Sequence, residues 1–156
     1  RATRGGLIGQ YSAFGNWDLQ PEDALMVTFK TADAPYLSIQ LGSLWFTSLD
    51  YESRVTSLNA HQLGCAPTAE CVLVIAGTDP GIKNWLDTAG YSRGLIFMRW
   101  QGLEALPDES SWPSVKKLPL ADLPAYLGGD WPPFTPEQRA AQRRERIQGV
   151  HSRFGG

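Results

Sequence analysis

The chain has 156 residues, 42% of them hydrophobic and 19% charged, which fits one compact globular domain. Fourteen Lys and Arg residues against sixteen Asp and Glu residues leave a net charge of −2, so the charge gives no reason to expect a nucleic-acid partner. The longest apolar runs, 72–76 and 95–98, are far shorter than the roughly 20 residues of a membrane-spanning helix, so we expect no membrane span. The first residue is Arg1 rather than Met, and no signal peptide follows it. We therefore expect a fragment or a processed product of a longer protein, and the sequence does not indicate its compartment.

Several β-strands are predicted along the first two thirds of the chain. Residues 1–15 are rich in glycine and show no regular period, which indicates an entry segment with at most one short strand. Alternating apolar and polar residues predict strands at 24–30 and 36–46, with a bulge or corner at Gly42 and Ser43, and a further strand is predicted at 95–100. An uninterrupted apolar run predicts a strand at 71–77 that is covered on both faces. A weaker strand is predicted at 55–62, and a turn followed by a short helical piece at 79–90.

The last third of the chain changes character. Most of the eleven prolines lie between Pro107 and Pro136, which predicts an extended strap over residues 103–134 that packs on the body. Thr135 as the N-cap, Pro136 at the first helical position and Gln138 three residues after the cap predict an Arg-rich helix over residues 135–156. Together these elements predict a mainly β, antiparallel sandwich with its core at 16–102.

Several blocks resemble the domain-of-unknown-function 1214 family over about residues 16–101. They are NWD at 16–18 with PEDAL at 21–25, SIQL at 38–41, SLN at 57–59, DPGIKNWLDTAG at 79–90 and GLIFMRW at 94–100. The resemblance implies a β-sandwich of jelly-roll type that forms the C-terminal part of a longer, bacterial protein. It therefore implies an N-terminal domain of the same protein as a partner, but no chemistry.

The 79–90 block carries the candidate ligand site. Asn84, Trp85 and Asp87 lie on a predicted tight turn, and Arg99 follows on the next strand. Arg binds carboxylates and phosphates, Asn and Asp bond hydroxyl groups, and Trp offers a flat apolar face, so the four residues suit a small polar or sugar-like ligand. The alternative is structural, with Asn84 or Asp87 capping the local backbone, Trp85 in the core and Arg99 paired with Asp87.

A divalent metal is a second candidate ligand. His61 lies on a predicted strand, and Asp50, Glu52 and Asp79 are carboxylate partners for it, a donor set that suits zinc or iron. The chain has two histidines in total, so such a site requires a partner subunit or a further part of the protein to complete it. The structural alternative is that His61 is an ordinary surface or core residue.

Two other features remain open on sequence alone. Cys65 and Cys71 flank a loop and fit either a disulfide or two free thiols. Trp112 with Pro113, and 131–134, are candidates for a docking surface, since a stiff segment loses little entropy on binding.

The sequence thus predicts an accessory or small-ligand-binding β-sandwich domain of a larger protein. The alternative is a metal-assisted hydrolase or lyase completed by an N-terminal region or a partner subunit. Assembly as a homo-oligomer, through the strap and the terminal helix, is a third reading.

Overall fold

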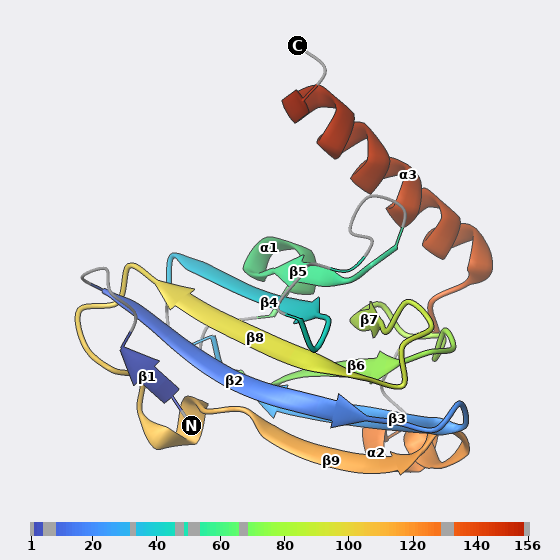
Figure 1. Ribbon diagram of the computed structural model, residues 1–156, viewed down its shortest axis with the longest axis horizontal. Coiled ribbons are helices and arrows are strands. Elements are labelled where there is room, and N and C mark those ends of the chain that lie inside the picture. The colour runs from blue at the N-terminus through green and yellow to red at the C-terminus, as the bar shows by residue number, and fades with distance from the viewer. Residues whose placement is uncertain are drawn as a thin grey trace.

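The computed structural model describes residues 2–4, 9–31, 34–45, 49, 54–65, 69–128 and 133–154. It is mainly β, with two sheets and a long C-terminal helix (Figure 1). The strands are β1 (Ala2–Arg4), β2 (Gln10–Asp18), β3 (Asp23–Phe29), β4 (Tyr36–Gly42), β5 (Ser57–Asn59), β6 (Cys71–Ala76), β7 (Trp85–Asp87), β8 (Arg93–Gln101) and β9 (Ser114–Pro119). The helices are α1 (Ala60–Leu63), α2 (Leu123–Leu127) and α3 (Pro136–Phe154), with 3-10 turns at Glu109–Ser111 and Leu120–Asp122.

The strands form two sheets whose inner faces pack together as a sandwich. The five-stranded sheet has the order β1-β2-β8-β4-β5, and the four-stranded sheet has the order β7-β6-β3-β9. The described neighbours pair antiparallel, except β6 and β7, which run parallel with Val74 opposite Trp85. The expected mainly β fold is confirmed, and the described strands pair antiparallel as expected except at the edge formed by β6 and β7.

Alternating side chains of both sheets build the main core. In β8, Ile96, Met98 and Trp100 are buried, while Arg93 and Arg99 point to the opposite face and are exposed. This period of two places one apolar row of each strand between the sheets. The buried residues from the facing strands include Leu25, Val27, Phe29, Leu37, Ile39, Leu41, Leu73, Ile75, Ile96, Met98 and Trp100.

The four-stranded sheet is also covered on its outer face. A second cluster joins Ala24, Val74 and Ala76 on that face to Leu118 of β9 and Leu123 of α2. Apolar residues therefore face both ways along β6, which explains the uninterrupted run in this strand. The prediction of a strand covered on both faces is confirmed.

The Pro-rich segment is built differently from the predicted extended strap. It supplies β9, which pairs with β3 from Asp23↔Pro119 to Thr28↔Ser114, and then the short helix α2. Its prolines lie where they remove few sheet bonds, because Pro119 ends β9 and Pro124 occupies the first turn of α2. The stretch 114–119 is therefore an edge strand of the sandwich rather than a strap laid over it.

Three other predicted elements differ from the structure. β2 begins at Gln10, so the first strand of the core crosses the boundary expected between residues 15 and 16. Residues 55–62 contain only the short strand β5, and the backbone then turns into α1, where Asn59 and Gln62 form a reciprocal capping box. The helical piece expected within 79–90 is wrong, because 85–87 form β7 against β6.

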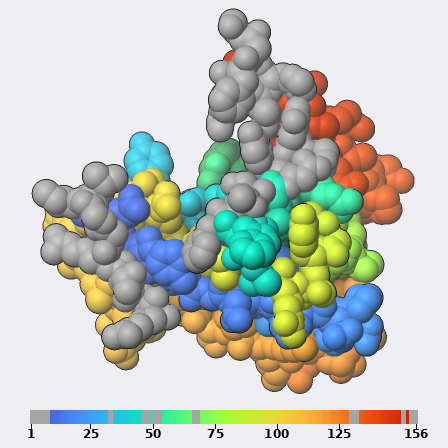
Figure 2. Space-filling model, viewed as in Figure 1, coloured from blue at the N-terminus to red at the C-terminus, as the bar shows by residue number. Residues whose placement is uncertain are grey.

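Helix α3 starts as predicted. The Thr135 hydroxyl accepts a hydrogen bond from the Gln138 backbone N–H at 3.1 Å, and the Gln138 side chain accepts one from the Thr135 N–H at 2.8 Å. This capping box fixes the first turn of the helix. The helix lies at one side of the molecule, beside β7, while β9 runs along another edge (Figures 1 and 2). No helix in the described ranges is long and apolar enough to cross a membrane.

Candidate functional site

Asn84, Trp85 and Asp87 of the 79–90 block are buried. The Asn84 amide donates to the Val72 carbonyl at 3.2 Å, and the Trp85 indole N–H donates to the Ala76 carbonyl at 3.0 Å. Asp87, only 1% exposed, accepts from the Ala89 backbone N–H at 2.8 Å. These side chains therefore tie β7 and the turn that follows it to β6.

Arg99 lies apart from this block. It is exposed on β8 in the five-stranded sheet, with Ser12 and Ser38 as its cross-strand neighbours, whereas Asp87 ends β7 in the four-stranded sheet. The pairing of Arg99 with Asp87 that the sequence suggested is wrong, because the Asp87 carboxylate accepts a hydrogen bond from the Arg54 guanidinium at 3.1 Å. The structure does not bring the four predicted ligand residues together around one opening.

The first turn of α3 explains why the 79–90 block is rich in polar residues. Arg139 is 2% exposed and binds Asp79 through two contacts, Nε to Oδ2 at 2.9 Å and Nη2 to Oδ1 at 3.2 Å. The same guanidinium donates to the carbonyls of Ile82 and Lys83. A planar donor set of this kind suits a carboxylate and carbonyls held in one plane. The loop 79–83 is thus the receptor for one arginine of α3.

Aromatic rings complete the environment of Arg139. Its guanidinium lies 4.9 Å from the centroid of the Trp85 ring and 4.4 Å from that of Phe134. The Phe134 N–H donates to the Gly81 carbonyl at 2.7 Å, which brings the start of the helix onto the same loop. Trp85 is therefore a wall for Arg139 rather than for an external ligand. We call Asp79, Trp85, Phe134 and Arg139 the helix clamp.

A second arginine holds the helix farther along. Arg146 donates to the Ser57 carbonyl at 3.0 Å and to its hydroxyl at 2.7 Å. Burial lowers the pKa of the Arg146 guanidinium. Arg139 and Arg146 are seven residues apart, so they lie on one face of the helix.

The structure places the predicted metal ligands separately. His61 is exposed on α1, so the prediction that it lies on a strand is wrong. Asp79 is bound by Arg139, and Asp50 and Glu52 lie outside the described residues. Within the part of the chain that the structure describes, no three His, Cys, Asp or Glu residues lie close enough to hold a metal ion.

Cys65 and Cys71 form a disulfide, with a Cα–Cα distance of 5.7 Å. Cys71 is buried at the start of β6, and Cys65 follows the left-handed cap of α1 at Gly64. The bond therefore joins α1 to the four-stranded sheet.

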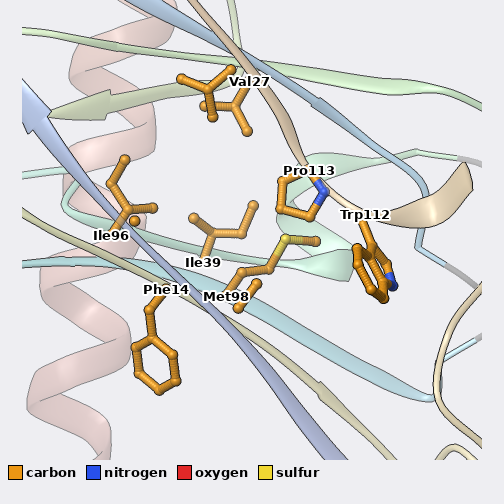
Figure 3. Close-up of a pocket in the computed structure, with 10 residues that line it drawn as sticks. Phe14, Val27, Ile39, Ile96, Met98, Trp112 and Pro113 are labelled. Atoms are coloured by element: carbon orange, nitrogen blue, oxygen red, sulfur yellow. The ribbon is translucent and has the colours of Figure 1, made fainter. Parts of the chain in front are cut away.

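A pocket that sequence analysis did not predict opens between the two sheets. Its volume is about 140 Å³. Its walls come from both sheets and from the segment before β9, and Figure 3 shows Ile39, Ile96, Met98 and Pro113 around the central space. The lining residues are Ala13, Phe14, Gly15, Val27, Ile39, Ile96, Met98, Trp112, Pro113 and Val115.

The pocket exists because β2 presents small residues where its neighbours present large ones. Ala13 pairs with Met98, and Gly15 pairs with Ile96, so each small residue leaves space beside a large apolar side chain. On the other side, Val115 of β9 shares the inner face with its cross-strand partner Val27, yet is 52% exposed. The space between β2 and β9 is therefore the mouth of the pocket.

Trp112 forms one wall of this mouth. Its indole N–H donates to the Pro107 carbonyl at 3.0 Å, which fixes the ring against the preceding turn. Of the features predicted from the sequence, the docking candidate formed by Trp112 and Pro113 lies nearest to the pocket, because both residues line it. Ala13 and Gly15 leave space in the pocket only because β2 and β9 both border it in the folded protein. No local sequence pattern indicates that these two strands come together.

Comparisons with known proteins indicate the fold and little beyond it. No family model matches the chain, and no curated protein matches it. A crystal structure of an uncharacterised protein from Burkholderia cenocepacia is similar, with a TM-score of 0.67 and 30% identity over 75% of this chain and 32% of that one. The VPA0106 protein from Vibrio parahaemolyticus is similar in fold, with a TM-score of 0.52 and 13% identity over 69% of this chain and 30% of that one. The chain thus spans about a third of the length of these two bacterial structures.

Proposed function

We propose that this chain is a small-ligand-binding β-sandwich module of a longer bacterial protein, and that the pocket between its sheets is the binding site. The observation that carries the proposal is the pocket itself, a concave apolar space with walls from both sheets and an open mouth. Small-molecule sites are commonly of this kind, largely preformed and lined by hydrophobic and aromatic side chains. Membership of the domain-of-unknown-function 1214 family and a jelly-roll topology are parts of the same proposal.

The similar structures support the modular part of the proposal. In both of them the matching region is about a third of a longer chain. A module of this kind contributes a binding function to the protein that contains it, with an N-terminal domain as its neighbour.

The two methionines of the chain provide a direct test. Met98 lines the pocket, whereas Met26 lies on the opposite face of β3, packed in the second cluster. We would label the methionine methyl groups with carbon-13, assign them with Met98→Leu, and titrate toluene, benzoate, benzylamine and glucose separately. The proposal predicts that at least one compound shifts the Met98 signal in a saturable way while the Met26 signal stays in place. A panel that leaves Met98 unmoved, or shifts both signals equally, contradicts it.

A further inference from the structure

We infer that the pocket selects an uncharged, apolar group of the size of a single six-membered ring, and that the missing side chain at Gly15 leaves the space for it. The inference rests on the proposed function and adds the class of ligand and the residue that leaves room for it. Three observations carry it: the chemistry of the lining, the volume, and the geometry at Gly15.

The lining offers no partner for a charge. Among the described residues that line the pocket, none has a charged side chain, and the one side-chain N–H, on Trp112, is already bonded to the Pro107 carbonyl. A charged or strongly polar group that enters such a space loses its hydration without a compensating hydrogen bond. A hydrocarbon group loses nothing comparable and gains contacts with Ile39, Ile96 and Met98.

The volume fits one ring. The pocket measures about 140 Å³. Apolar cavities of about 150 Å³ lined by aliphatic and aromatic residues bind benzene. Since the mouth between β2 and β9 is open at Val115, a substituent on the ring can extend into solvent.

Gly15 occupies the position where a side chain would take up this space. A Cβ at Gly15 would lie 3.9 Å from Cβ and from Cδ1 of Ile96, which is ordinary contact. A larger residue is therefore tolerated by the strand backbone but must project beside Ile96 into the pocket. The absence of a side chain at Gly15 is thus a condition for the pocket rather than for the fold of β2.

The test compares one ring with and without charge, in the protein with and without a filled pocket. We would titrate toluene, benzoate and benzylamine and follow the labelled methyl groups of Met98 and Met26. Toluene is expected to shift Met98 selectively, and its dissociation constant is expected to be at least about tenfold lower than those of the two charged compounds. Gly15→Leu should abolish the toluene effect, while Gly15→Ala should retain it.

A matched control separates filling of the pocket from a general effect on β2. Asn16→Leu adds the same side chain on the exposed, opposite face of the strand, and should leave toluene binding unchanged. Thermal unfolding of each variant shows whether it is folded.

Each other result overturns the inference in a recognisable way. Charged compounds that shift Met98 with affinity equal to that of toluene would mean that the pocket binds ligands but that its class is wrong. Toluene binding that survives in a folded Gly15→Leu would mean that the ring does not need the space beside Gly15. No selective shift of Met98 by any compound would overturn the proposed function together with the inference.

Discussion

The helix clamp and the pocket between the sheets differ in how they use their residues. The clamp gathers charged and aromatic side chains from 79–85, from Phe134 and from α3, and these contact one another, so that Asp79 and Arg139 already have partners. The pocket gathers apolar residues from five strands and from the segment before β9, and leaves a space between them. A conspicuous polar motif can thus be internal structure, while a candidate binding site arises where small residues leave a gap.

The largest effect is expected from Arg139→Ala. The substitution removes both contacts to Asp79 and leaves the carbonyls of Ile82 and Lys83 without this donor. We expect the free energy of unfolding to fall by about 2–4 kcal/mol, below the upper limit for a fully buried pair because Asp79 is partly exposed. Urea denaturation measures the change, and faster proteolysis within α3 should accompany it.

Arg144→Ala is the matched control, because Arg144 is exposed on the same helix. Its free energy of unfolding should stay within about 0.5 kcal/mol of the unchanged protein. Equal losses in the two variants would mean that Arg139 is not a clamp.

The next largest effect is expected at Asp87. Asp87→Ala leaves the Ala89 N–H and the Arg54 guanidinium without this acceptor, so we expect a loss of about 1–3 kcal/mol. Asp87→Asn should cost less, because its side-chain oxygen can still accept from Ala89. If a fully stable Asp87→Ala variant lost ligand binding, the result would instead support the ligand site that the sequence predicts in the 79–90 block.

Trp112→Ala tests the wall of the pocket. Trp112 is half-buried, so its truncation removes the apolar contacts of the buried part of the ring. We expect the free energy of unfolding to fall by about 1–2 kcal/mol. The wider mouth should also let naphthalene shift the Met98 methyl signal, which the unchanged pocket should restrict. Trp112→Phe, which keeps an aromatic wall, is the control and should bind toluene normally.

Arg99→Ala should have as small an effect on stability as the control Arg144→Ala. Arg99 is exposed and lies on the outer face of β8, away from the clamp and the lining of the pocket. We expect stability within about 0.5 kcal/mol and toluene binding unchanged. Loss of binding with intact stability would support the sequence-based assignment of Arg99 as a ligand residue.

A pH effect is expected at the turn before the pocket wall. Hydrogen bonds from the backbone and side chain of Ser110 lower the pKa of Asp108 from its usual value of 3.8. The carboxylate therefore stabilises the turn above that value, and this contribution is lost as the pH falls through the lowered pKa. The indole N–H signal of Trp112 should stay constant from pH 7 to about pH 5 and move only in stronger acid. A transition centred above 3.8 would contradict the role of Asp108.

Local sequence patterns predicted the elements whose determinants are local. The alternation in β3 and β4 and the capping box of Thr135 and Gln138 depend on neighbouring residues, and the structure has all three. The capping box of Asn59 and Gln62 has the same kind of local sequence signature, so it also predicts the start of α1.

The remaining features depend on contacts between distant residues. β7 is a strand because it pairs with β6 and because Trp85 packs under Arg139, which lies 54 positions later in the chain. The metal and ligand predictions rest on side-chain chemistry alone, which does not show whether a neighbouring residue already binds each group. The pocket depends on the small residues Ala13 and Gly15 of β2, which line the same space as Val115 of β9.

The most direct measurement is a crystal structure of the protein determined under xenon pressure, since xenon binds in apolar cavities. We predict a xenon atom between Ile96, Met98 and Val115, with the Arg139 guanidinium on Asp79 in the same crystal. A pocket without xenon, or an α3 detached from the loop 79–83, would contradict the division between a structural clamp and a binding pocket.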